Sequence, residues 1–347
     1  MRKVDEQLTG VENLVDVNDD EVQLERSDEE KYLGDVISKD GKNTKNILAR
    51  KAKGLGVIDQ ISSMLENICF GPYQIEIALL WRNALLLNSI LTNCEAWYGV
   101  TLQDISHLEQ VDEIFLRKIL EAPSSSPKCM LYLETGCKPI RFLIKMRRLM
   151  FLQYILKEDP TSLISTFFHA QDANPSRNDW SLSCRKDMEE LDIKISYDDI
   201  REMSCDSFKK VVSEAILKLS TEYLNSEKGK LRKVKHIPHN SLTIQEYLVP
   251  NVTNLKLAKF IYHARNRILD VKANYKNKHD DLLCPVCSLP NTVDSQEHLL
   301  HCSKLVDTML VQGDLRYEDL FSSDVKKQVT IATVMQKLWA KRKSILK

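Results

Sequence analysis

The sequence predicts a mainly α-helical protein, and three observations support that fold class. Glycine and proline are scarce, with ten of each among 347 residues, whereas average usage is about 7% and 5%. Apolar residues recur at three- and four-residue steps through most of the chain after residue 43, which is the period of an amphipathic helix. Leu, Lys and Glu, which are good helix formers, are abundant in the chain. A chain of this length has room for two or three domains of roughly 100–200 residues each.

The N-terminal 42 residues are the exception, because their pattern predicts a small β element. Apolar and polar residues alternate in Val15-Asp16-Val17 and Val22-Gln23-Leu24, and Asn18-Asp19-Asp20 between them is typical of a turn. Lys31 to Ile37 predicts one further strand, which ends at Lys39-Asp40-Gly41.

Helical periodicity then defines the rest of the organisation. Residues 159–198 are more polar and are interpreted as a linker between two helical halves. We therefore divide the chain into residues 1–42, a helical region 43–158, a linker and helical region 159–254, and a C-terminal region 255–347. The predicted helices are residues 47–65, Pro72 to Asn93, Gln103 to Leu120, Pro139 to Lys157, Asp198 to Met203, Asp206 to Asn225, Leu255 to Leu269, and a closing helix from Ser323 to Ile345.

Charge is distributed unevenly although the formal net charge is zero. Residues 1–30 contain eleven acidic and three basic residues, a net charge of −8. Residues 225–280 contain twelve basic and four acidic residues, a net charge of +8, and Lys337 to Lys347 add five bases. A basic second half favours a polyanionic partner such as nucleic acid.

Cysteine usage and hydropathy indicate an intracellular protein. The nine cysteines are an odd number and do not form a disulfide framework, which fits a reducing compartment. The N-terminus has no apolar segment typical of a signal peptide. The most apolar stretch, Ile75 to Leu91, is interrupted by polar residues and predicts a buried helix rather than a membrane span. Six cysteines lie singly, at Cys69, Cys94, Cys129, Cys137, Cys184 and Cys205.

The other three cysteines form a motif that predicts a structural zinc site. The motif is Cys284-x2-Cys287-x10-His298-x3-Cys302. Two thiolates on a tight turn, followed by His and Cys four residues apart, can close a tetrahedron around zinc. His301 is an alternative fourth ligand, and Cys302 is preferred because zinc favours soft thiolates. Four protein ligands leave no open position, so the predicted role is structural.

Several segments, in this order, resemble non-LTR (LINE-type) retrotransposon reverse transcriptases. Lys31-Tyr32-Leu33-Gly34, followed by Asp40-Gly41, resembles the Y-L-G strand that leads from the palm to the thumb. Ile90 to Tyr98 resembles the thumb motif, an apolar helix ending in Y-G-x-E-x-W, although Asn93-Cys94 replaces Tyr-Gly. The next helix ends in Leu116-Arg117-Lys118-Ile119-Leu120, similar to the common L-R-x-I-L ending.

The C-terminal motif completes this resemblance. The family has a C-C-H-C zinc knuckle, and here too a Glu-His-Leu-Leu run, Glu297 to Leu300, precedes the last cysteine. The similar segments cover about residues 20–120 and 255–320, while residues 159–250 contain no motif of the family. The resemblance implies a palm-edge remnant, a helical thumb, a helical linker and a zinc knuckle with a closing helix.

The resemblance also implies that the thumb and the basic C-terminal region bind RNA and DNA, largely without sequence preference. Because the family acts on DNA, the resemblance adds the nucleus to the cytoplasm as an expected location. A phosphate contact would release counterions, and the alternative for each side chain is plain solvation. Tyr262 and Tyr275 are candidate base-stacking residues, with core packing as the alternative. The candidate phosphate contacts are Arg141, Lys145, Arg147, Arg148, Lys228, Lys230, Arg232, Lys233, Lys235, Lys256, Lys259, Arg265 and Arg267.

Polymerase activity is not expected of this chain alone. Nucleotide transfer needs carboxylates that hold two metal ions, and the family places them in an F/Y-A-D-D box upstream of the Y-L-G strand. Magnesium is therefore expected only if a palm domain is supplied. Tyr197-Asp198-Asp199 lies after the thumb, and two acids at a helix start are expected from the helix dipole.

Three interpretations follow from the sequence. The chain is a truncated reverse transcriptase that binds nucleic acid, an expressed remnant whose zinc knuckle and helices bind a protein partner, or part of a full polymerase whose palm is encoded upstream.

Overall fold

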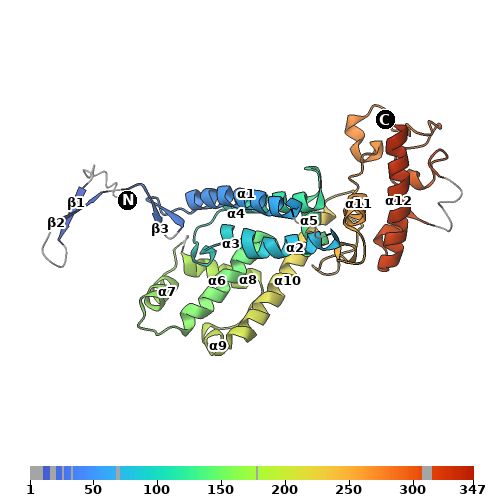
Figure 1. Ribbon diagram of the computed structural model, residues 1–347. Coiled ribbons are helices and arrows are strands. Elements are labelled where there is room, and N and C mark those ends of the chain that lie inside the picture. The colour runs from blue at the N-terminus through green and yellow to red at the C-terminus, as the bar shows by residue number, and fades with distance from the viewer. Residues whose placement is uncertain are drawn as a thin grey trace.

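The computed structural model describes residues 11–15, 21–25, 27–32, 34–67, 71–176, 179–306 and 315–347. Within these residues the protein is mainly helical, as predicted, with short strands at the N-terminal end and a Cys3His cluster followed by a closing helix (Figure 1). No helix in the described ranges is long and apolar enough to span a membrane. The α-helices are α1 (Thr44–Asn67), α2 (Gln74–Trp81), α3 (Leu87–Ile90), α4 (Leu102–Leu120), α5 (Lys128–Thr135), α6 (Ile140–Lys157), α7 (Leu163–Ala173), α8 (Trp180–Glu190), α9 (Tyr197–Glu202), α10 (Cys205–Gly229), α11 (Leu255–Arg265) and α12 (Val325–Ile345).

The N-terminal end forms two antiparallel strand pairs, β1 (Val11–Val15) with β2 (Glu21–Glu25) and β3 (Glu29–Tyr32) with β4 (Asp35–Ser38). The predicted turn at residues 18–20 lies outside the described residues, as does Leu33. The prediction of one strand from Lys31 to Ile37 is wrong, because the chain reverses after β3.

Gly34 explains that reversal. Its φ is +89°, a conformation that glycine adopts without steric cost. Tyr32 pairs with Asp35 across the turn, so Tyr32 ends β3 and Gly34 immediately precedes β4.

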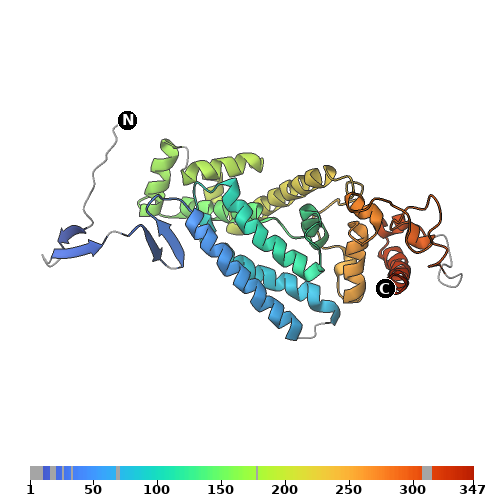
Figure 2. The same cartoon turned by 90° about the horizontal axis from the view of Figure 1, so that it is seen from above.

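The long helices α1 and α4 pack side by side over α2 and α3 (Figures 1 and 2). Gly54 of α1 faces the side chains of Ile90 and Val111, which leave no room for a Cβ atom at this position. A capping box between Thr101 and Asp104 starts α4, since it satisfies backbone N–H groups that have no partner inside the helix.

The helix predicted from Pro72 to Asn93 is divided in the structure. A 3-10 turn at Gly71–Tyr73 precedes α2, and a π-helical turn at Arg82–Leu86 separates α2 from α3. Arg82 is buried in this π turn and donates two hydrogen bonds of 2.6 Å to the carboxylate of Asp112 on α4. Such turns are rare variations on the α-helix that periodicity alone does not predict.

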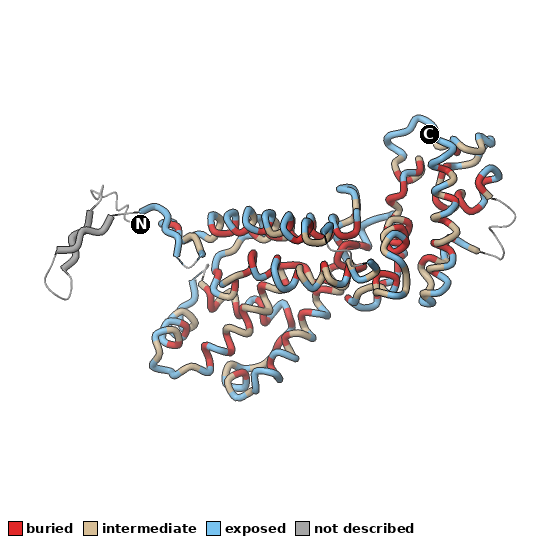
Figure 3. The backbone as a smooth tube through the Cα atoms, in the orientation of Figure 1, coloured by how far each residue is buried: buried red, intermediate tan, exposed pale blue. Residues whose placement is uncertain are grey.

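A second core lies under α6 to α10, separate from the core of the α1–α4 layer. Figure 3 shows buried residues along the inner faces of these helices and exposed residues outside. The interpretation of residues 159–198 as a polar linker is wrong, because they form α7 and α8. Phe168 and Trp180 from these two helices are buried and meet edge to face, with ring centroids 6.0 Å apart.

The C-terminal helices α11 and α12 share one continuous core with the α1–α5 layer. Glu134 of α5 is fully buried at this junction. Its carboxylate accepts hydrogen bonds from Tyr247 Oη at 2.7 Å and from Arg265 Nε at 3.2 Å, and His239 Nε2 lies 3.5 Å away. This group connects α5, α11 and the loop after α10, so it fixes how the C-terminal region sits on the helical layer.

Candidate metal centre

The Cys3His cluster is built on a short hairpin after α11. The backbone N–H of Cys284 donates to Thr292 O at 2.9 Å, and that of Asp294 donates to Leu282 O at 2.7 Å. Ser288 and Asn291 adopt left-handed backbone conformations, with φ of 52° and 63°. The hairpin therefore turns tightly between its two arms and places Cys284 and Cys287 on one side.

The remaining two side chains come from the segment that follows the hairpin. A 3-10 turn at His298–Leu300 carries His298, and Cys302 lies two residues after its end. This short turn brings both side chains to the cluster. The backbone N–H of His298 donates to Ser295 Oγ at 3.2 Å.

The ligand atoms of the four side chains all lie within 4.8 Å of one another. Sγ of Cys284 and Sγ of Cys302 are 4.0 Å apart, and Sγ of Cys287 is 3.4 Å from Nε2 of His298. Zinc–sulfur bonds of about 2.3 Å in a tetrahedron separate neighbouring ligands by roughly 3.8 Å. The cluster could therefore hold a metal ion such as zinc.

The geometry also decides between His301 and Cys302 as the fourth member. Cys302 is buried and belongs to the cluster, whereas His301 is exposed and does not. The cluster that could hold a metal ion therefore contains Cys302 and not His301.

The protonation of the thiols is set by their surroundings. A hydrogen bond from the Leu289 backbone N–H contributes most to lowering the pKa of Cys287 to about 6, assisted by Thr292 and His298. Burial raises the pKa of Cys302 to about 11. Metal binding requires deprotonated thiols, so a metal ion would displace the proton from Cys302.

Buried polar side chains fasten the hairpin to the helices. Asp294 is fully buried, and its Oδ2 accepts from Arg342 Nη2 of α12 at 2.8 Å and from the backbone N–H of Lys272 at 3.0 Å. Gln296 is also fully buried, and its Nε2 donates to Ala264 O at 2.7 Å. The sequence analysis did not identify these supporting residues, because a single Asp or Gln in a loop carries no periodic signal.

The four basic residues of α6 that were predicted to contact phosphate bind partners within the protein. Arg141 donates two hydrogen bonds of 2.8 Å to Glu109. Lys145 and Arg148 both bind Asp187 of α8, at 2.5 and 2.6 Å. Arg147 also has a partner within the protein, because its side chain donates to Leu91 O at 2.7 Å. Arg148 is buried, so its role here is to hold α8 rather than to contact phosphate.

Two further predicted contacts are buried and bonded. Lys228 donates to Ile237 O at 2.6 Å, and burial lowers its pKa. Arg265 binds Glu134 and donates to Leu320 O at 2.5 Å. These side chains close the junction below α11 and do not reach the surface, which corrects the prediction for both.

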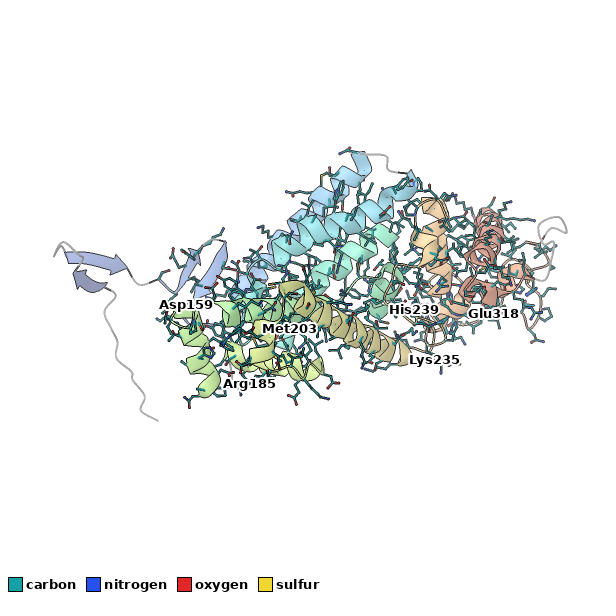
Figure 4. The ribbon with its side chains drawn as sticks, turned by 90° about the horizontal axis from the view of Figure 1, so that it is seen from below. Asp159, Arg185, Met203, Lys235, His239 and Glu318 are labelled. Atoms are coloured by element: carbon teal, nitrogen blue, oxygen red, sulfur yellow. The ribbon has the colours of Figure 1, made fainter. Side chains whose placement is uncertain are left out.

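The other candidate phosphate contacts differ in whether their side chains have a partner within the protein. Lys230 pairs with Glu227, Lys259 with Glu121 and Arg267 with Glu297, while Lys233 donates to Asn274 O. The candidates that are exposed and have no side-chain partner among the described residues are Arg232, Lys235 and Lys256. Figure 4 shows Lys235 beyond the end of α10.

The two tyrosines proposed for stacking also differ. Tyr262 is fully buried and its hydroxyl lies 3.0 Å from Ser126 Oγ, so it belongs to the core. Tyr275 is partly exposed, and its hydroxyl donates to Ile268 O at 3.1 Å.

The thumb-like motif forms a junction near the start of α1. Trp97 is buried, and Trp180 of α8 donates from Nε1 to Glu95 O at 2.7 Å. Asn93 has a left-handed backbone with φ of 58°. These contacts are structural.

Asp198 and Asp199 also have a structural role, in the first turn of α9. Ser196 caps this helix, because its Oγ accepts from the Asp199 N–H at 3.1 Å.

Comparison with known proteins adds no further assignment. No protein-family model matches the chain, and no curated protein or solved structure shows significant similarity to it.

Proposed function

We propose that this protein binds nucleic acid, that its Cys3His cluster holds a structural zinc ion, and that the chain is related to the C-terminal part of non-LTR retrotransposon reverse transcriptases. The observation that carries the proposal is the convergence of four zinc-type ligand atoms within 4.8 Å. Three sulfurs and one imidazole nitrogen suit zinc in both chemistry and spacing. The order of the thumb-like and knuckle motifs supports the family.

In this proposal zinc has no catalytic role. Its four positions are filled by Cys284, Cys287, His298 and Cys302, which leaves none for water or substrate. The metal would join the hairpin to the turn that follows it. The chain's contribution to function would then be binding, through exposed bases that attract phosphate.

Binding to single-stranded RNA at increasing salt tests this function. We expect log Kobs to fall linearly with log salt, because each phosphate contact releases a counterion. A matched titration with a neutral peptide nucleic acid of the same sequence should show no binding. Absence of RNA binding at low salt would reject the nucleic-acid function.

One observation favours a second candidate, a zinc-containing module that binds a protein. Many of the predicted basic contacts, including Arg141, Lys145 and Arg148, are engaged by acidic residues of the chain itself. A protein-binding module would bind RNA only weakly and would release it by about 0.2 M salt. Retention of RNA above that salt concentration would exclude this candidate.

A further inference from the structure

A basic cavity lies beside the metal centre, between two segments that are distant in sequence. One wall is the turn after α10, with Arg232, Lys233 and His236, and the other is the 3-10 segment Lys272–Lys278. The cavity has a volume of about 710 Å³. Lys276 and Lys278 were not identified by the sequence analysis, because an exposed lysine in a turn has no distinguishing pattern.

The charge of this cavity is one-sided. Its lining includes Arg232, Lys233, Arg267, Lys276 and Lys278, and no carboxylate among the residues that the structure describes there. Arg267 is compensated by Glu297, which lies outside the lining. The side chains of Arg232 and Lys276 have no described partner, so the cavity keeps an excess of positive charge.

Direct contacts join the two walls of the cavity. Lys233 donates to the backbone oxygen of Asn274, and the Asn274 side chain, which is buried, donates to Gln296 Oε1 at 2.9 Å. Tyr275 has the amino groups of Lys233 and Lys278 at 5.3 and 5.5 Å from its ring centroid. Burial and the nearby charge of Arg267 lower the pKa of Lys233, because both disfavour its protonated form. A bound anion would stabilise that protonated form.

We infer that this cavity binds the phosphodiester backbone of single-stranded nucleic acid. The inference rests on the proposed function and deepens it by naming the place and the strand class. Like charges held close together by fixed partners are unfavourable until an anion enters, and phosphate oxygens accept from both Arg and Lys. Sites for single strands combine a basic groove with an aromatic side chain on which a base can stack. The partly exposed Tyr275 lines this cavity among its basic residues, which favours a single strand as the ligand.

The same chain of contacts connects the cavity to the metal centre. The backbone N–H of Ala273 donates to Asp294 O at 2.9 Å, and Asn274 reaches Gln296 two residues before His298. The metal hairpin therefore supports one wall of the cavity.

The test compares two double variants that remove the same charge. Lys276→Ala/Lys278→Ala changes the cavity, and Lys209→Ala/Lys210→Ala changes two exposed lysines near the start of α10. Each is titrated against a labelled single-stranded oligouridine over a range of salt. We expect the cavity variant to lose roughly tenfold in affinity and about 0.7 in salt slope for each contact removed, while the control changes little. Lys276→Arg/Lys278→Arg should restore binding.

The outcomes separate this inference from the proposed function. If wild type binds the RNA and the cavity variant weakens no more than the control, the inference is overturned while the function stands. If wild type binds no RNA at all, the proposed function fails first. Polyglutamate of matched charge competing as well as RNA would overturn the phosphodiester assignment. Unchanged thermal melting and metal content in both variants show that the lysines act at the surface.

Discussion

Gly54 and Gly56 lie two residues apart on α1 but face different surroundings. A Cβ atom added to Gly54 would lie 2.6 Å from Ile90 Cγ2 and 2.8 Å from Val111 Cγ1, whereas one added to Gly56 would meet nothing within 4 Å. Gly54 lets α3 and α4 approach α1 closely, because it has no side chain. Gly56 has no such neighbour, so its only effect is the low helix propensity of glycine.

Alanine at these two positions should therefore change stability in opposite directions. We expect Gly54→Ala to lower the free energy of unfolding by about 1–2 kcal/mol through overpacking. Gly56→Ala should raise it by about 0.5–1 kcal/mol, because alanine is the better helix former. Urea denaturation of both variants measures this, and equal effects would contradict the close packing of α1.

The buried Glu134 gives the second prediction. Burial alone would raise its pKa, but the charge of Arg265 and the bonds of His239 and Tyr247 lower it from 4.5 to about 2. Glu134→Gln leaves Arg265 buried without its counter-charge, and we expect it to lower the free energy of unfolding by about 3–5 kcal/mol at pH 7. Denaturant titration of the two proteins gives this difference.

The pH dependence of that difference has a definite sign. A carboxylate with a lowered pKa stabilises the fold fully above its unfolded pKa, and the contribution is lost as pH falls through the folded value. The gap between wild type and Glu134→Gln should therefore shrink between pH 4.5 and about pH 2. Both proteins carry the same metal cluster, so its own loss at low pH cancels. A gap independent of pH over this range would show that Glu134 is not the paired carboxylate described.

Sequence reasoning reached some of these residues and missed others for physical reasons. Cysteines 284, 287 and 302 were predicted because metal ligands have a narrow set of spacings. Glu134 and Asp294 were not, because their partners are distant in sequence and only tertiary packing makes them buried ion pairs. For the same reason the sequence could not tell the exposed Arg232 from the buried Arg265.

Helix α6 shows at the scale of an element how a basic pattern misleads. Its lysines and arginines resemble a phosphate-binding face in sequence, yet Lys145 and Arg148 both form ion pairs with Asp187 of α8. The helix is central to the second core rather than an exposed surface.

We therefore expect Lys145→Ala/Arg148→Ala to lower stability without weakening RNA binding by the folded protein. Removing both partners leaves Asp187 buried and unpaired, at a cost of about 3–5 kcal/mol. Lys157→Ala, an exposed base at the end of the same helix, is the control and should change stability little. Chemical denaturation and RNA titration below the transition measure the two properties, and a stable variant with reduced RNA affinity would restore α6 as a binding surface.

Element prediction succeeded where periodicity was strong. The predicted helices at 103–120, 139–157 and 323–345 correspond to α4, α6 and α12 within one or two residues. Helices α7 and α8 were missed because few of their apolar residues reach the core, among them Phe168 and Trp180. Leu163 and Phe167 of α7 are exposed, so its apolar residues do not form one continuous buried face.

At the scale of the whole molecule, the metal centre and the helical layer form one connected structure. The core of the α1–α5 layer continues into α11 and α12, and Asp294 links the metal hairpin to α12 through Arg342. A metal ion in the Cys3His cluster would therefore stabilise the C-terminal region as a unit and, through Asn274, one wall of the basic cavity.

The zinc content of the purified chain is the measurement that tests the account most directly. We predict one zinc per chain in wild type and in His301→Ala, since His301 lies outside the cluster. The Cys284→Ser/Cys287→Ser variant should lose it, and Cys205→Ser, which changes an exposed free cysteine, should keep it. Wild-type protein without zinc after purification in zinc-supplemented buffer, or zinc retained by the double serine variant, would contradict the account.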